Sequence, residues 1–392
     1  ALAVQNPDSA VSMLNVAVGQ DAGVNITTGE QNTIVGGLAG DALNTGGLNV
    51  AFGLHALGGD TKGSRSTALG YSALLTQNFT TATNTFNTAV GFEAGKSVTT
   101  GDQNTLIGGS AGDALTVGNN NVAVGYESLS GDTKGDRNVA IGRAALQAQN
   151  FTSTTDSYNV AVGYGAGESI TTGISNTFVG GLAGDGTDDG VQNVAVGILA
   201  LSANCGNSNT AIGSEALTAC TGASNTALGK DAGSSVTSGS NNLILGFQSG
   251  ISGSPGGNLQ TASNRISLGD ENITEFSAQV DVSPASDERD KTDFVALDLG
   301  LAFIKALEPV TYYWDKRSKY GDKTAEDYDL NAQTPDGTHK EDWMDVGFKA
   351  QSVETLEIAA GYTKENKTNL ISRLSPDGKQ YSLTYSKFVP IL

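Results

Sequence analysis

The sequence is short of the residues that build a large globular core. Only 6% of its 392 residues are aromatic, 38% are hydrophobic, and proline occurs 7 times. A chain of this length usually forms more than one structural unit, and one large core would need more apolar side chains. A repetitive fold needs fewer, because it buries small apolar residues in thin stacked layers.

Cysteine and histidine are almost absent. Cys205 and Cys220 are too few for the disulfide framework of a small secreted protein. They hold nearly equivalent places in adjacent repeats and could stack, although free thiols are favoured for assembly in a reducing cytosol. His55 and His339 are too scattered for a metal site or a catalytic triad. We therefore expect no metal and no other cofactor.

Positive charge is also scarce, since the formal net charge is -19. A chain that binds a nucleic-acid backbone needs a basic surface, so nucleic acid is excluded as a partner. The sequence has no apolar run long enough to span a bilayer, no signal peptide and no lipidation motif, so we expect no membrane insertion. Because the chain starts at Ala1, we expect a fragment or a processed chain.

What the sequence does contain is a repeat. The motif N-[VT]-A-[VIL]-G-x-x-[AS]-[GL] recurs through residues 15–250, mostly every 17 residues, with two steps of 21 and two of 16. Its fourteen copies start at Asn15, Asn32, Asn49, Ser66, Asn87, Asn104, Asn121, Asn138, Asn159, Asn176, Asn193, Asn209, Asn225 and Asn242.

A second period of 72 residues lies on top of the first. Asn15, Asn87 and Asn159 are 72 residues apart, and the ninth position of the motif reads Gly, Gly, Leu, Leu and then repeats. The segment GDTKGSR near 60 returns as GDTKGDR near 132. Four motifs thus form one super-repeat, and the third super-repeat loses its long fourth loop.

The repeat predicts a β-solenoid that is mainly β in structure, with one short strand in each turn, or rung. The second and fourth motif positions share one face of the strand, and the alanine lies on the other. The glycine permits a turn with positive φ, and the asparagines stack between rungs and cap turn amides. Fourteen rungs give a rod of roughly 65–70 Å. We expect the alanine to face outward, against another subunit; the alternative is that it faces water.

The chain changes character after the repeats. Residues 1–14 are a lead-in, and residues 251–285 are expected to form a loop and an intertwined β neck. In PASDERDKTDF, 284–294, charges crowd together after Ser286. On its own this stretch is an exposed linker, because charge runs are usually solvated. It begins a separate C-terminal unit, residues 286–392.

The motif N-x-A-[VI]-G resembles the N-S-V-A-I-G repeat in the heads of trimeric bacterial adhesins of the YadA type, most closely in NRISLG at Asn264. The resemblance covers roughly residues 15–269, although the period here is longer. It implies a left-handed parallel β-roll in which three chains pack around one axis.

Four segments of the C-terminal unit stand out, in this order: SDERDKTD, LGLAFIKALEPVTYYWD, VGFKAQSVE and SPDGKQYSLTYSKFVPIL. They resemble, in the same order, the intramolecular chaperone domain (peptidase S74) of phage endosialidases, tail spikes and tail fibres. The resemblance covers residues 286–392 and implies an α+β domain that trimerises, sets the solenoid chains in register and then cuts itself off. The family usually continues as a long helix, so we expect residues 286–392 to be a form of this domain truncated at its C-terminal helix.

By position, the resemblance makes Ser286 the nucleophile, Lys291 the base and Asp287 a residue that orients them. The bond to be cut joins Ala285 to Ser286. A serine hydroxyl is inert until a base takes its proton, and a lysine can serve when burial favours its neutral form. The assembled trimer is expected to supply that burial.

The two resemblances imply a homotrimeric tail fibre or tail spike that binds a glycan or protein receptor on a bacterial surface. Other tail proteins would attach through an N-terminal region, and the protein would assemble in the host cytoplasm and reside in the virion tail. A trimeric bacterial adhesin and a glycan-degrading tail spike are the alternatives. Because no paired carboxylates stand out, we expect binding and not depolymerisation.

Several weaker signals are better explained by structure. GFEAGKS, 91–97, has one residue too few between its glycines for a phosphate loop. Asp185, Asp188 and Asp189 lack the order of a calcium loop, so a solvated loop is favoured. A set of aromatic residues follows the repeat glycine and either binds sugars or covers rung edges: Tyr71, Phe92, Tyr126, Tyr164 and Phe247.

Overall fold

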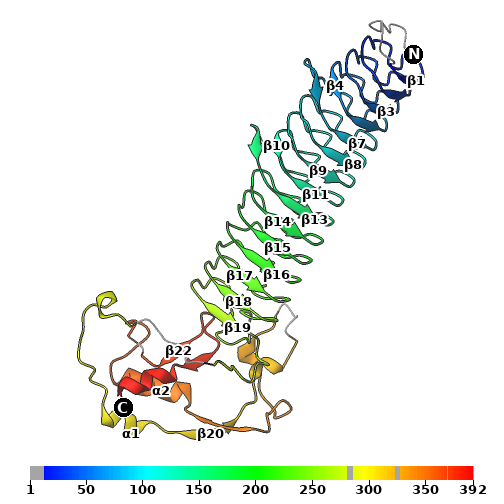
Figure 1. Cartoon of the computed structure of the whole chain (residues 1–392). Helices are drawn as coiled ribbons and strands as arrows, with labels where there is room; N and C mark the ends of the chain where they lie inside the picture. The colour runs from blue at the N-terminus through cyan, green and yellow to red at the C-terminus, as the bar shows by residue number, and fades with distance from the viewer. Residues whose placement is uncertain (1–12, 280–285, 323–326, 369, 392) are drawn as a thin grey trace.

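A computed structural model describes residues 13–279, 286–322, 327–368 and 370–391. The described chain is mainly β, an elongated rod with a C-terminal domain at one end (Figure 1). No described helix is long and apolar enough to cross a membrane.

The rod is one parallel sheet of fifteen strands that follow one another in sequence order, one strand per rung. Each strand has three residues, and equivalent motif positions pair, as Ala140 pairs with Ala123. The strands are β1 (Val16–Val18), β2 (Thr33–Val35), β3 (Val50–Phe52), β5 (Thr67–Leu69), β7 (Thr88–Val90), β8 (Thr105–Ile107), β9 (Val122–Val124), β11 (Val139–Ile141), β13 (Val160–Val162), β14 (Thr177–Val179), β15 (Val194–Val196), β16 (Thr210–Ile212), β17 (Thr226–Leu228), β18 (Leu243–Leu245) and β19 (Ile266–Leu268).

The sheet continues beyond residue 250, where the repeats were expected to end. NRISLG supplies β19, which pairs in parallel with β18. The stretch 272–279, expected to begin an intertwined β neck, contains no strand. The remainder of that segment, 280–285, lies outside the described residues.

The prediction that the motif alanine faces outward is wrong. Ala51, Ala123 and Ala195 are fully buried, whereas the strand positions on either side face outward, as Val50 and Phe52 do at 42% and 53% exposed. Alternation along a strand defines two faces without saying which is inside. The interior of a rung is narrow, so the small residue lies there and the larger ones lie outside.

The 72-residue period is a pattern of volumes in this interior. Where the central strand residue is large, the ninth motif position is glycine, as in the pair Leu106 and Gly112. A β-carbon built on Gly112 would lie 2.8 Å from Leu106 Cδ2. Where the central residue is alanine, as at Ala123, the ninth position can be a buried leucine, Leu129. Each combination keeps the interior densely filled.

The predicted asparagine ladder is confirmed. The Asn121 side chain is fully buried, its Oδ1 accepts from the backbone N–H of Asn138 at 2.9 Å, and its Nδ2 donates to the carbonyl of Gly135 at 2.9 Å. The same arrangement recurs from rung to rung, including at Asn209. Each asparagine therefore satisfies backbone groups of the next rung, which no ordinary strand ladder reaches.

The glycine after the strand is required for two reasons. Gly125 has φ of 140°, in a region that side chains oppose, and a β-carbon there would lie 2.4 Å from the carbonyl oxygen of Gly142 in the next rung. Equivalent glycines therefore stack in direct backbone contact along the rod.

Two loops project from one edge of the rod (Figure 1). At each of these places the loops of two successive rungs pair as a two-stranded parallel sheet: β4 (Gly63–Ser64) with β6 (Thr83–Asn84), and β10 (Gly135–Asp136) with β12 (Thr155–Asp156). Beneath the second lies Asp132, which accepts from Gln149 Nε2 at 2.6 Å. Burial raises the pKa of the Asp132 carboxyl, and hydrogen bonds from Gln149 and the Gly135 N–H oppose that rise.

The C-terminal domain contains only short helices and strands. It contains η1 (Glu288–Asp290), α1 (Leu301–Ala306), β20 (Val310–Tyr313), η2 (Arg317–Lys319), η3 (Leu330–Ala332), β21 (Met344–Gly347), α2 (Ala350–Ala359), β22 (Ser372–Leu374), β23 (Tyr381–Leu383) and η4 (Tyr385–Ile391). The antiparallel pairs are β20 with β21 and β22 with β23.

A buried carboxylate joins helix α2 to strand β22. Glu357 accepts from the backbone N–H groups of Leu370, Ile371 and Ser372 at 2.8, 2.6 and 3.0 Å, and from the Ser372 hydroxyl. Hydrogen bonds to an ionised acceptor are stronger than neutral ones, so this contact positions α2 over the domain's small core.

The ladder predicts that an asparagine's contribution to the free energy of unfolding depends on its burial, and not on its hydrogen bond alone. Asn209→Ala should lower the free energy of unfolding by about 1–3 kcal/mol, because it leaves buried backbone groups unsatisfied. Asn207→Ala is the matched control in the same rung: Asn207 is exposed and accepts from Val191 N–H at 2.9 Å. Its loss should cost less than about 1 kcal/mol in denaturant unfolding, and equal costs would contradict this explanation.

The volume pattern predicts a compensating pair. Ala123→Leu should destabilise by about 1–3 kcal/mol through overpacking, and Leu129→Gly by more, through a cavity. The double variant reproduces the combination at Leu106 and Gly112 and should recover part of the loss in denaturant unfolding. Additive losses would show that the two positions do not share one interior space.

Candidate functional site

The structure brings Ser286 and Lys291 together. Lys291 Nζ lies 2.7 Å from Ser286 Oγ and 3.2 Å from the Ser286 carbonyl oxygen. The one-turn helix η1 lies between them and folds the chain back, so that residues five apart meet. This distance is within the reach required of a nucleophile and its base.

Asp287 stabilises the η1 turn through contacts with Arg289, and its recorded contacts are not with Ser286 or Lys291. Its Oδ1 accepts from the Arg289 backbone N–H at 2.9 Å, which caps η1, and its Oδ2 pairs with the Arg289 guanidinium at 2.6 Å. This guanidinium lowers the pKa of the Asp287 carboxyl. The predicted role of orienting Ser286 and Lys291 stays a prediction, and in this geometry it would act through the turn.

The site is open to solvent. Every residue from 286 to 298 is exposed, and Leu299 is the first buried residue after the pair. In Figure 1 this stretch runs outside the body of the domain as far as α1. Ala285, the other side of the expected cleavage bond, lies outside the described residues. The described chain thus brings the side chains of Ser286 and Lys291 together and leaves them exposed to water.

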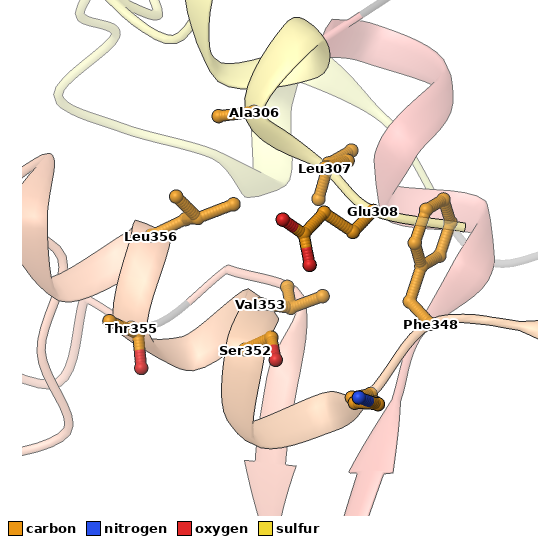
Figure 2. Close-up of a pocket in the computed structure, with 9 residues that line it drawn as sticks. Ala306, Leu307, Glu308, Phe348, Ser352, Val353, Thr355 and Leu356 are labelled. Carbon is orange, nitrogen blue, oxygen red and sulfur yellow. The ribbon is translucent and has the colours of Figure 1, made fainter. Parts of the chain in front are cut away.

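A groove lies between the end of α1 and the start of α2 (Figure 2). Its apolar walls are Leu307, Phe348, Val353 and Leu356, and the exposed Ser352 also lines it. Figure 2 shows the Glu308 carboxylate reaching into the opening between these walls. We call this feature the α1–α2 groove.

Residues of the weaker sequence signals make contacts within the rod. Thr171 Oγ1 donates to the Asp188 carboxylate, and in GFEAGKS Lys96 Nζ pairs with Glu93 at 2.9 Å. Among the described residues no group of three or more His, Cys, Asp or Glu side chains could hold a metal ion. Cys205 and Cys220 are buried and free; burial raises the pKa of both thiols, that of Cys220 to about 11, so neither is reactive.

The aromatic residues after the repeat glycine are exposed, and their recorded ring contacts are with one another or with a neighbouring cationic side chain. Tyr71 and Phe92 stack with ring centroids 5.2 Å apart. Arg143 lies over the rings of both Tyr126 and Tyr164, at 5.9 and 5.4 Å. These contacts cover rung edges and still leave ring surface available to a ligand.

Sequence reasoning missed three features of this region: the Asp287–Arg289 pair, the groove, and the buried Glu357. The first had a signal, because an acidic residue two positions before arginine can cap a turn. The groove had none, since its two walls come from segments about forty residues apart.

One comparison with known proteins found a match. Residues 286–362 match the peptidase S74 family, described as the chaperone of endosialidase, and the match begins at Ser286. No curated protein and no solved structure matches the chain. The chain therefore carries, after its parallel β-solenoid, a chaperone-of-endosialidase domain.

Proposed function

We propose that this chain is the homotrimeric shaft of a phage tail fibre or tail spike that binds a bacterial surface receptor. Its C-terminal domain gathers three chains, sets their rungs in register and then cuts itself off between Ala285 and Ser286. The Ser286–Lys291 contact, at the first residue of the family match, is the observation that carries the proposal.

The outer strand face supports association of the shafts. Val18, Phe52, Ile141 and Leu228 are 58%, 53%, 38% and 51% exposed, and together with their neighbours they form one apolar stripe along the rod. Soluble monomers rarely expose so continuous an apolar surface. Three identical chains around one axis would cover it with a closed, symmetric interface.

The C-terminal domain supports association for the same reason. Its core cluster is small: Leu299, Phe303, Val353, Ile371, Phe388 and Ile391. Trp343, Val346 and Val389 remain 80%, 68% and 69% exposed. A domain of this size with so small a core gains the burial it lacks from neighbouring copies.

The cleavage chemistry balances with water as the only co-reactant. Neutral Lys291 takes the proton of Ser286 Oγ, and Oγ attacks the carbonyl carbon of Ala285. The peptide C–N bond breaks, the amine of Ser286 receives a proton from Lys291, and an ester joins the Ala285 carbonyl to Oγ. Water then hydrolyses the ester, which leaves a carboxylate on Ala285 and restores the Ser286 hydroxyl.

A fibre of identical rungs needs such a device. Motif positions that pair with their equivalents in one rung could pair almost as well one rung further along, because the ladder contacts repeat. A clamp at one end of the shaft removes this ambiguity. Once the clamp is cut away, the trimer cannot retrace its folding path, so its persistence becomes kinetic.

Receptor binding is assigned to the exposed shaft. The stacked rings of Tyr71 and Phe92, and the arginine between Tyr126 and Tyr164, offer flat faces beside polar groups. Aromatic side chains with polar partners suit wet interfaces, including those with surface glycans. The protein would assemble in the host cytoplasm and reside in the virion tail.

Removal of the nucleophile should abolish cleavage. Mass measurement of the purified chain should detect a fragment that starts at Ser286, and Ser286→Ala should yield only the uncut chain, because no hydroxyl is left to attack. Lys291→Gln should also stay uncut, while Lys305→Gln, at an exposed lysine outside the pair, should cut normally. A wild-type chain that stays uncut under all conditions would rule out autoproteolysis.

Charge on the outer strand face should break the trimer. The uncut Ser286→Ala chain should sediment at about three times its mass of 39.9 kDa. Adding Ile212→Asp and Leu228→Asp, at paired positions of adjacent rungs, should shift it to the monomer, because buried unpaired carboxylates are costly. Thr152→Asp, in an exposed loop, is the control and should remain trimeric. A monomeric parent chain would contradict the proposal.

A further inference from the structure

We infer that residues 286–298, here named the arm, dock into the α1–α2 groove of a second copy of this chain, and that this docking completes the cleavage site. The inference rests on the proposed self-cleavage and adds which surfaces meet and which copy supplies them.

The arm carries apolar residues that its own chain leaves uncovered. Phe294, Val295 and Leu297 are 68%, 89% and 42% exposed, and the first of them stands three residues after Lys291. Within the part of the chain that the structure describes, the arm makes one hydrogen bond to the rest of the domain, from Tyr362 Oη to Asp298. A run of exposed apolar residues with so few contacts of its own is suited to lie on another surface.

The groove presents the complementary surface. Its walls are apolar, and Glu308 and Lys349 give it one charge of each sign. The arm carries Asp293 immediately before its apolar run, and its charge is opposite to that of Lys349 in the groove. Laying Phe294 between the groove walls would therefore bury apolar area and bring Asp293 toward Lys349.

A second copy is the occupant that the geometry favours. The arm and the groove are both uncovered on one chain, so each copy can give an arm to one neighbour and receive an arm from another. Three copies close this head-to-tail exchange into a ring without leaving a free arm. The apolar outer face of the rod calls for the same kind of partner.

Docking would also remove the obstacle to chemistry at the pair. Lys291 must be neutral to accept the proton of Ser286 Oγ, and removal from water favours the neutral form of an amine. The arm reaches only three residues from Lys291 to Phe294, about 10 Å. A surface that holds Phe294 therefore lies close to the pair, and we expect it to shield the pair from water, so that an unassembled chain stays uncut.

The test uses two chains that cannot cut alone. Ser352→Trp fills the groove and keeps Ser286, and Ser286→Ala keeps the groove and cannot react. Ser352 is exposed on the surface of α2, so the substitution leaves the domain core unaltered. Each chain expressed alone should stay uncut. On co-expression the Ser352→Trp chain should be cut, in about half of its copies at equal expression, because its arm then meets an intact groove in the neighbour.

Two further variants serve as controls. Gln351→Trp places the same residue one position along α2, outside the groove, and should cut when expressed alone. The arm variant Phe294→Ser with Val295→Ser should stay uncut, and co-expression with Ser286→Ala should not rescue it, because its own arm is defective. This difference between rescue and failure identifies the direction of the exchange.

Three results would overturn the inference. Ser352→Trp cut on its own would show that the groove is not needed, and Ser352→Trp uncut beside Ser286→Ala would place the arm in its own groove or elsewhere. Cleavage of the arm variant on co-expression with Ser286→Ala would show that the apolar residues of its own arm are not needed. A wild-type chain that never cuts would instead contradict the proposed self-cleavage, so the two failures can be told apart.

Discussion

The rod depends on the rung-to-rung contact of identical residues. Asparagine above asparagine and glycine above glycine make each layer the template for the next, with buried amides satisfied across the step. No rung could stand alone, since each has a three-residue strand and a few interior side chains. Because equivalent residues recur in every rung, a shift in register by one rung would lose almost no hydrogen bonds.

The volumes of the interior side chains distinguish one rung from the next, which the repeated hydrogen bonds of the ladder do not. The pairing of a large strand residue with glycine, and of alanine with leucine, changes from rung to rung and returns after 72 residues. If rungs of one chain stacked out of their native order, most of them would therefore face a rung whose interior side chains do not fit in volume. The volume pattern specifies stacking within one chain, but it lies inside and cannot align one chain with the next.

In the proposed trimer, alignment between chains would come from surfaces that face outward, and two such surfaces are uncovered in the described chain. The outer strand face is apolar and nearly uniform along the rod, so it favours association without setting register. The arm and the groove belong to a single place at the end of the chain. In the proposed trimer, a unique contact at one end would impose register on a uniform contact along the length, and this would account for the position of the Ser286–Lys291 pair on the arm.

Repetition made much of the fold readable from sequence. The strand positions, the positive φ of Gly125 and the role of Asn121 followed from residues that recur at equivalent places. The same reasoning placed the alanine on the wrong face, because alternation over three residues defines two sides and no inside. The exchange between Leu106 with Gly112 and Ala123 with Leu129 was the available signal, since only packed positions need compensating volumes.

The sequence by itself determined the parallel stack of rungs, the ladder that joins them, and, through resemblance, the residues Ser286 and Lys291. These depend on local geometry and on chemistry that neighbours in the chain supply. Only the tertiary structure decided which strand face is buried, that Asp287 pairs with Arg289, and that a groove forms between α1 and α2. Those outcomes depend on which distant segments share a space, and one-dimensional periodicity does not contain that information.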